Sequence, residues 1–151
     1  MTRRVRVSRN RRVGTKRASE ATIWSALERI QDPCSVASGA PAGLVSMGLV
    51  RGVEVHGPPD AAEVNVTLCI TEPGCLMSAV FKNTAERELS ELPEVESVNV
   101  EVDYGYLWDP SDMAPAYRER LERKRAATVA RMNKRPKGPS SSGNASRRGI
   151  R

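Results

Sequence analysis

The alternation of apolar and polar residues predicts three β-strands in the middle of the chain. In 63–70 (EVNVTLCI) every second residue from Val64 is aliphatic, and 95–102 (VESVNVEV) repeats this alternation. A period of two residues is typical of a strand with one buried face. The stretch 49–56 (LVRGVEVH) is predicted as a further strand, and the turn residues 57–60 (GPPD) connect it to the next one. These segments predict a small sheet.

Three further segments are predicted to be helical. A helix over 19–31 has Ser19 as its N-cap and ends before an Asp-Pro pair, which disfavours helical backbone. An amphipathic helix is predicted over 76–92, and a polar, charged helix over about 113–132. The residues 34–43 are rich in Ser, Ala, Gly and Pro, and we expect them to form a loop.

The predicted element order is α-β-β-α-β-α. This order is typical of an α+β domain, here a small mixed sheet of about three strands with helices on one face. The 151 residues suffice for one such domain but not for two, and we place it at 19–132. We expect the flanking arms, 1–18 and 133–151, to be disordered, because they are dense in charge or rich in Pro, Gly and Ser and have little apolar surface to bury.

Charge is divided unevenly between the domain and the arms. Residues 1–17 contain eight Lys or Arg and no Asp or Glu. Residues 118–151 contain twelve Lys or Arg and two Glu. The residues 18–117 carry four Lys or Arg against sixteen Asp or Glu. The net charge of this body is therefore near −12, although that of the whole chain is +6. A basic nucleic-acid-binding domain is therefore not indicated. Nucleic-acid binding by the arms remains an alternative, although no aromatic residues alternate with their charges for stacking.

The three cysteines include no CxxC pair, which argues against a disulfide framework or a complete four-cysteine zinc site. A reducing, cytoplasmic setting fits this pattern. No apolar run has membrane-spanning length, and none follows the basic N-terminus as a secretory signal would. The acid-free N-terminus would also suit an organellar transit peptide, but the equally basic C-terminus favours a cytoplasmic protein with a disordered arm.

Cys75 has the most informative position of the three cysteines. It follows a Pro-Gly turn where the strand pattern ends and the helix pattern begins, in the first turn of that helix or one residue before it. The free N–H groups and positive dipole end at a helix start would stabilise a thiolate. Position alone fits a buried, unreactive cysteine equally well.

Five stretches of the sequence resemble one known family. They are ALERIQDPCS, GLVSMGLVRGVEV, VNVTLCITEPGC, VFKNTAERELSELPEVESVNVEV and YLWDPSDMAPAYR. In this order, over about residues 20–118, they are similar to the PaaD/SufT-type family of iron–sulfur cluster assembly factors. The resemblance implies a small α+β scaffold whose loop cysteine helps to deliver or assemble iron–sulfur clusters, or to mature an iron-dependent oxygenase.

The family's motifs carry over only in part. Asp32 matches its Asp-Pro-Glu loop, but Cys34 replaces the Glu, and Ser46 replaces an Asp before its leucine-glycine-leucine-valine segment. Thr71 and Cys75 match its Thr-x-x-x-Cys-Pro loop without the final proline. The resemblance implies that Cys75 is a ligand of iron or a cluster. Cys34 is a second candidate, since a thiol is the softer ligand that such clusters use, with Asp32 and Thr71 in support.

The C-terminal aromatic element provides the remaining candidates. Trp108, Met113 and Arg118 correspond to the family's aromatic-Trp element. Together with Tyr106 we expect them to bind a partner, and a packed C-terminal flap that also includes Tyr104 is the alternative.

Two other residues with reactive side chains are expected to be structural. Cys69 lies on the Asn65/Thr67 face of its predicted strand, where a cysteine more often packs than reacts. His56, the chain's one histidine, ends a strand beside a turn and is expected to be solvated.

The resemblance thus implies a non-enzymatic maturation factor. Cys75, with Cys34, would hold iron or an iron–sulfur cluster transiently until a client metalloprotein, such as an oxygenase subunit, takes it by ligand exchange. Other cluster-assembly proteins are expected partners, and a homodimer in which each copy supplies both cysteines would provide four ligands. No membrane or nucleic-acid partner is expected. The alternatives are an arm-driven nucleic-acid-binding protein and a thiol enzyme, which would have His56 as its base.

Overall fold

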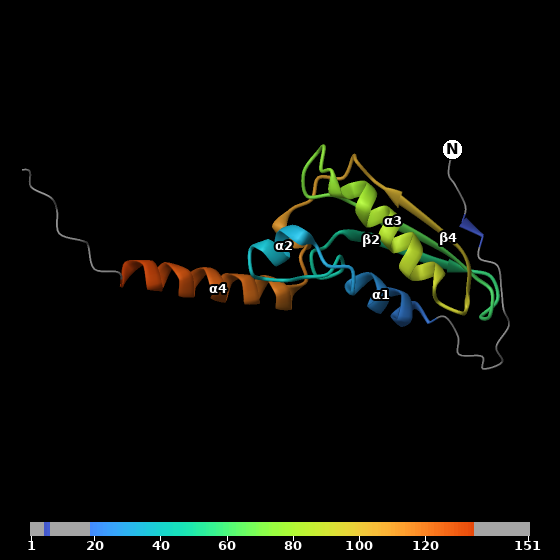
Figure 1. Ribbon diagram of the computed structural model, residues 1–151, viewed down its shortest axis with the longest axis horizontal. Helices are drawn as coiled ribbons and strands as arrows, with labels where there is room; N and C mark the ends of the chain where they lie inside the picture. The colour runs from blue at the N-terminus through green and yellow to red at the C-terminus, as the bar shows by residue number, and fades with distance from the viewer. Residues whose placement is uncertain (1–4, 7–18, 135–151) are drawn as a thin grey trace, which may run out of the picture.

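The sheet combines parallel and antiparallel strands. The computed structural model describes residues 5–6 and 19–134 (Figure 1). The strand order is β1-β4-β3-β2, with β1 at Val5–Arg6, β2 at Val50–His56, β3 at Ala62–Leu68 and β4 at Val95–Val102. β2 pairs antiparallel with β3, β3 pairs parallel with β4, and β1 pairs antiparallel with β4. The three predicted strands and their mixed sheet are confirmed, and β1 is a short additional strand that the sequence pattern did not indicate.

The helices confirm the predicted order and add two short segments, α2 and η1. They are α1 (Glu20–Glu28), α2 (Pro33–Ala37), α3 (Met77–Ser90), the 3₁₀ helix η1 (Pro110–Asp112) and α4 (Pro115–Asn133). α1 and α3 cover one face of the sheet, whereas α4 extends away from it (Figure 1). None of the described helices is both long and apolar enough to cross a membrane. Of the predicted arms the structure describes Val5–Arg6, which forms β1, and residues 133–134, which end α4, so these residues are not disordered, contrary to the prediction. The rest of both arms lies outside the described residues, where the disorder stays a prediction.

The predicted first helix begins as expected and ends earlier. The Ser19 side chain accepts a hydrogen bond from the backbone N–H of Thr22 at 3.2 Å, which confirms Ser19 as the N-cap. Ile23 and Leu27 are fully buried one turn apart and fix the helix on the sheet. The next two N–H groups bond to carbonyls three residues back, so the helix tightens and ends at Glu28, not near residue 31.

The predicted loop at 34–43 is wrong at its start, where α2 forms. Asp32 caps this helix, since its Oδ2 accepts a hydrogen bond from the N–H of Ser35 at 2.7 Å. Pro33 occupies the first turn, where a missing N–H costs nothing because no partner exists for it there. The same Asp-Pro pair that stops a preceding helix therefore starts a new one.

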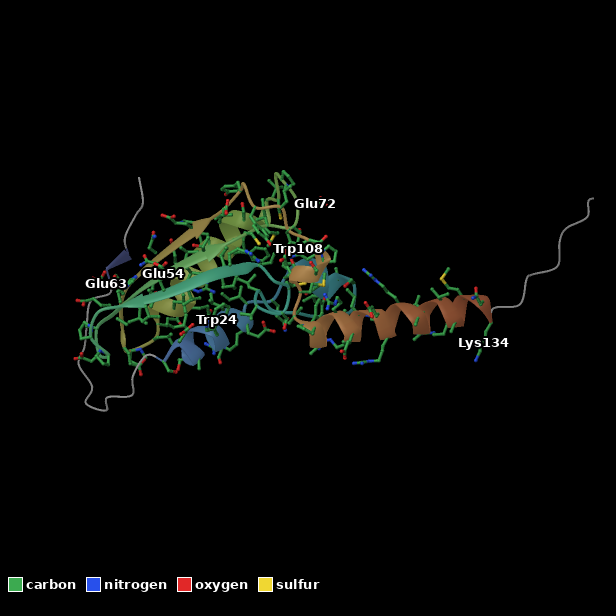
Figure 2. The ribbon with its side chains drawn as sticks, turned by 180° about the vertical axis from the view of Figure 1, so that it is seen from behind. Trp24, Glu54, Glu63, Glu72, Trp108 and Lys134 are labelled. Carbon is green, nitrogen blue, oxygen red and sulfur yellow. The ribbon has the colours of Figure 1, made fainter. Side chains whose placement is uncertain are left out.

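The crossover through α3 places three segments at one end of the sheet. Because β3 and β4 are parallel, the chain leaves both at the same end, into residues 71–76 and 103–114. The N–H of Asp103 bonds to the carbonyl of Leu68 at 2.8 Å, which holds these exits together. β2 enters the sheet at this end, since Val50 pairs with Leu68, so residues 44–49 join them. Glu72 and Trp108 lie here, far from Glu63 at the other end (Figure 2).

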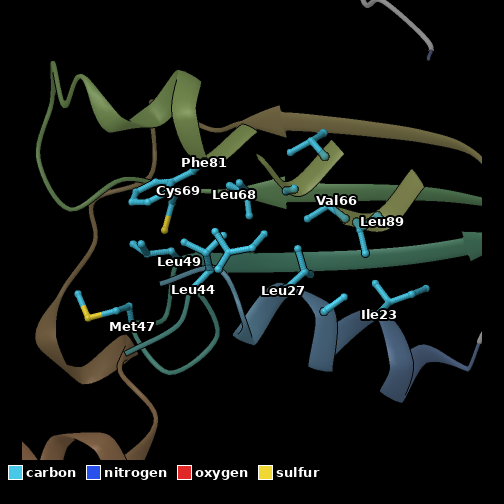
Figure 3. Packing of buried hydrophobic residues seen from close by; sticks show 14 of the residues in the cluster. Ile23, Leu27, Leu44, Met47, Leu49, Val66, Leu68, Cys69, Phe81 and Leu89 are labelled. Atoms are coloured by element: carbon cyan, nitrogen blue, oxygen red, sulfur yellow. The ribbon is translucent and has the colours of Figure 1, made fainter. Parts of the chain in front are cut away.

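The core lies between the sheet and the helices α1 and α3 (Figure 3). The predicted alternation in β3 is confirmed, because Val64, Val66 and Leu68 are buried while Glu63 and Thr67 are exposed. Further fully buried members of the core are Leu44, Leu49, Leu89, Val98 and Val100. The core thus supports the three segments that meet at its end.

Candidate functional site

Cys75 lies on an exposed turn, the Cys75 loop (residues 71–76). Gly74 has φ +84°, a left-handed conformation that suits glycine, and the N–H of Cys75 bonds back to the carbonyl of Glu72 at 3.2 Å. The Cys75 side chain is half-buried, and the next residue, Leu76, is 91% exposed. Thr71 is half-buried at the start of the same loop. The loop therefore presents its cysteine at the surface.

α3 begins shortly after this cysteine in the chain. Its first helical residue is Met77, so Cys75 stands two residues before the helix and not in its first turn. The N-cap is Leu76, which makes no side-chain capping hydrogen bond. The N–H of Ser78 bonds to the carbonyl of Cys75 at 3.3 Å, and the other N–H groups of the first turn lack the acceptor that a Ser or Asp cap would supply. Such a helix start can accept a negatively charged group.

Cys69, six residues earlier, is in the opposite environment. Its side chain is 1% exposed and its sulfur points toward the segment around Leu49 (Figure 3). The thiol donates a weak hydrogen bond to the carbonyl of Gly48 at 3.6 Å. Burial raises the pKa of Cys69 to about 11, against the effect of the Arg51 charge. The predicted packing role of Cys69 is confirmed.

His56 is exposed at the far end of β2, with its Nε2 3.5 Å from a carboxylate oxygen of Glu54. It pairs with Glu63, whereas the Cys75 loop follows the other end of β3. The predicted solvated position is confirmed, and the one histidine of the chain lies away from Cys75.

Cys34 is exposed in the first turn of α2. Unlike the start of α3, this helix start already has an acceptor, because the buried Asp32 carboxylate caps it. Asp32 therefore has a clear structural task, which is to hold α2 in place below the thiol of Cys34.

Cys34 and Asp32 line a groove of about 480 Å³ between α2 and α4. Its other lining residues are Ser35, Ser38, Met47, Met113, Tyr117, Leu121, Lys124, Arg125, Thr128 and Val129. The structure thus brings Asp32, Cys34 and Met113 together, but Cys75 and Thr71 do not line this groove. Within residues 5–6 and 19–134, no group of three or more His, Cys, Asp or Glu side chains is placed to hold a metal ion.

The predicted aromatic candidates belong to the C-terminal segment (residues 103–114), which packs on residues 44–49. Trp108 donates its indole N–H to the carbonyl of Met47 at 2.9 Å, and the N–H of Ala114 bonds to the carbonyl of Ser46 at 3.0 Å. Gly48 allows this approach, since a Cβ there would lie 2.2 Å from the carbonyl oxygen of Asp112. Trp108 is therefore an anchor of the segment.

A polar network that the sequence analysis missed holds the same segment. The Tyr106 hydroxyl donates to a carboxylate oxygen of Asp112 at 2.9 Å, and Arg51 lies over the Tyr106 ring at 3.8 Å. The N–H of Asp109 and the Tyr106 hydroxyl lower the pKa of Asp112, and the same hydrogen bond raises the pKa of Tyr106. Arg51 and Asp112 are 61 residues apart, so no local spacing could reveal their contact.

Ser46 stands where the resembling family has an Asp, and here it faces Glu28. The N–H and hydroxyl of Ser46 donate to the Glu28 carboxylate at 2.8 and 2.5 Å. An Asp at this position would put two carboxylates side by side. In this chain α1 supplies the carboxylate and the loop supplies the donors, which makes the Asp-to-Ser replacement compatible with the fold.

The fold and the site define a small α+β scaffold that displays an accessible loop thiol. Residues 20–102 match the family model described as iron–sulfur cluster assembly protein. The chain therefore belongs to this family, which confirms the resemblance to PaaD/SufT-type factors. The match ends with β4, so the C-terminal segment and α4 lie beyond it. A search of the curated proteins gave no match.

Solved structures share the fold. A domain of unknown function from Bacillus anthracis is 25% identical, with a TM-score of 0.57 over 68% of this chain and 91% of its own. A conserved hypothetical protein from Thermotoga maritima is 24% identical, with a TM-score of 0.55 over 72% of this chain and 98% of its own. A Mycobacterium tuberculosis protein associated with iron–sulfur complex assembly and repair is more distant, at 18% identity over 73% of this chain and 94% of its own, with a TM-score of 0.42.

Proposed function

We propose that this chain is an accessory factor of iron–sulfur cluster assembly whose Cys75 holds iron or a cluster on its way to a client metalloprotein, such as an iron-dependent oxygenase. The observation that carries the proposal is the contrast between two nearby thiols. Cys75 lies on an exposed turn before an uncapped helix, whereas Cys69 is buried with a raised pKa. Membership in the assembly family supports the same conclusion.

Ligand exchange requires a site that an incoming ligand can reach. The Cys75 loop meets this requirement, because Glu72, Pro73, Gly74 and Leu76 are all exposed around the thiol. A thiolate is the soft ligand that iron–sulfur clusters use. The free N–H groups at the start of α3 can in addition donate hydrogen bonds to the negatively charged sulfurs of a cluster.

The remaining ligands have to come from outside the loop. Among the described residues no group of three metal-binding side chains exists, and the second exposed thiol, Cys34, lies in the groove at α2. A cluster at Cys75 would therefore be shared with a second copy or with another assembly protein. Sharing with a partner suits transfer, since the chain holds its cargo by few bonds and can release it by exchanging them.

A thiol enzyme is the competing function. It would need a base beside Cys75, and the one histidine of the chain lies at the opposite end of the sheet. The position of His56 therefore favours the carrier, which needs no base.

Anaerobic reconstitution of the full chain with ferrous iron and sulfide tests the proposal. We expect visible sulfur-to-iron charge-transfer absorption that is lost in Cys75→Ser, and transfer of the cluster to an apo-ferredoxin. Far-ultraviolet circular dichroism controls for folding, and Cys34→Ser is the matched exposed-thiol variant. Unchanged absorption and transfer in Cys75→Ser would show that Cys75 is not the ligand.

A further inference from the structure

Among the residues that the structure describes, the hydrogen bonds that attach α4 to the domain come from its first half. The Tyr117 hydroxyl donates to the carbonyl of Ala40 at 2.9 Å, and the Lys124 ammonium donates to the carbonyl of Ser38 at 2.9 Å. After Leu121 every described residue of the helix is exposed. The helix therefore projects from the body up to Lys134, as Figures 1 and 2 show.

The projecting part carries an apolar stripe on one side. Thr128, Val129 and Met132 follow Leu121 at i+7, i+8 and i+11, which places the four residues on one helix face. Lys124 and Arg125, at i+3 and i+4, lie on the same face and separate Leu121 from the other three. Val129 is 55% and Met132 70% exposed. The first three residues of the apolar stripe (Leu121, Thr128, Val129 and Met132) thus form part of the groove wall, and Met132 extends it along the helix.

The floor of the groove is apolar and adaptable. Met47 and Met113 contribute unbranched thioether side chains, and Tyr117 contributes a buried ring. Methionines are frequent on surfaces that accommodate different apolar partners, since their flexible side chains fill irregular gaps. Together with the stripe, this floor suits the apolar face of a helix.

The rim of the groove is positively charged. Residues 118–134 contain seven Lys or Arg against two Glu, a net charge of +5. Of these, Lys124 and Arg125 line the groove itself. An occupant with acidic residues beside its apolar face would complement both the stripe and this rim.

We propose that the groove between α2 and α4, extended by the apolar stripe, docks an acidic amphipathic helix of a partner protein. A nucleic acid would engage the charges but leave the apolar floor and stripe unused. The α4 of a second copy would be repelled, because each carries a net charge of +5 over residues 118–134. The docking surface goes beyond the proposed function because Cys75 takes no part in it, and it uses a helix that lies beyond the family match.

A designed peptide tests this surface on the full chain. The probe is a fluorescein-labelled 18-residue helix with leucines at i, i+3, i+4 and i+7 spacing and glutamates on its other face, measured by fluorescence anisotropy. We expect Val129→Glu to weaken its affinity by about tenfold, because a charge replaces an apolar contact. The matched control Ala130→Glu, with the same charge change one residue along on the opposite face, should alter affinity by less than about twofold.

Cys34 provides a second, independent readout because it lines the groove. Saturating peptide should slow the alkylation of Cys34 and leave that of Cys75 unchanged. A scrambled peptide of equal composition should do neither.

Several results would overturn the proposal. Peptide affinity that Val129→Glu and Ala130→Glu weaken equally, or that is equal for the scrambled peptide, would contradict it. So would duplex DNA that displaces the peptide and binds Val129→Glu as tightly as the wild type. A homodimer in sedimentation that Val129→Glu dissociates would assign the surface to a second copy. The Cys75→Ser reconstitution is unaffected by any of these results, so the two proposals fail separately.

Discussion

Cys75 and Cys34 both lie close to a helix start, yet the two helix starts differ. α3 has fourteen residues and no side-chain cap, and Cys75 precedes it on an exposed turn. α2 has five residues, and Asp32 already caps it beside Cys34. Proximity to a helix start is therefore not enough to define an anion or cluster site. What matters is whether the free N–H groups are still available and which surface the thiol faces.

The strongest test of this difference is cluster retention by the two serine variants. We expect Cys75→Ser to lose the reconstituted cluster completely and Cys34→Ser to keep most of it, because only Cys75 faces an uncapped helix start. Iron and sulfide content after gel filtration measures the effect. Equal loss in the two variants would favour the arrangement in which both cysteines of each copy bind one shared cluster.

Alkylation rates separate the three thiols without any cluster. Cys69 should react at least about a hundredfold more slowly than Cys75, since a fully buried thiol reacts only after local opening. If exposure alone set the rate, Cys34 would be alkylated fastest. We expect Cys75 to react faster, because the uncapped start of α3 would stabilise its thiolate. Mass spectrometry of the chain after timed exposure to iodoacetamide measures all three. A faster Cys34 would mean that access, and not the helix start, sets reactivity here.

The sequence predicts most of the fold and the place of Cys75 after a turn, but not the α2 helix start or the groove that Cys34 faces. The alternation in β3 and the Ser19 cap are local patterns, so the strands and the first helix follow from them. The burial of Cys69 does not, because the alternation placed it on the face of Asn65 and Thr67, whereas β3 ends at Leu68 and the next two residues are both buried. α2 was missed because its Asp-Pro pair is also a helix stop. The groove was missed because its two walls come from segments far apart in sequence, and the charges of α4 conceal the spacing of its apolar stripe.

Asp32 is the residue that separates the two helix starts, and its replacement should make them more alike. Asp32→Ala should lower the free energy of unfolding by about 1 kcal/mol, the usual cost of losing an N-cap. It should also increase the alkylation rate of Cys34, because the first turn of α2 loses its acceptor.

Asp32→Asn is the matched control, since an asparagine side chain still caps a helix but carries no charge. Urea denaturation and alkylation of the folded chain measure the two effects. If Asp32→Ala is as stable as the wild type, the cap is not what holds α2 in place.

The smallest expected effect concerns the C-terminal segment, in which the hydrogen bonds among Tyr106, Asp109 and Asp112 hold the part that packs on residues 44–49. The pKa of Asp109 is lowered by hydrogen bonds from Ser111, and that of Asp112 by the N–H of Asp109 and the Tyr106 hydroxyl. A lowered folded-state pKa gives stabilisation that is present above the ordinary value of 3.8 and lost as the pH falls through the lower folded-state value.

Acid should therefore loosen the C-terminal segment at a pH where the Cys75 loop is unchanged. Trp108 reports on this segment, because its indole N–H bonds to the carbonyl of Met47, and Trp24→Phe removes the other tryptophan signal. We expect a change of Trp108 fluorescence below pH 3.8 that Asp112→Asn makes smaller. The reaction of Cys75 with 4,4′-dithiodipyridine, which reacts with thiols in acid and is therefore measured at the same pH, should not change. A fluorescence change that is identical in Asp112→Asn would mean that other carboxyls hold the segment, and that the Arg51–Tyr106–Asp112 network does not control it.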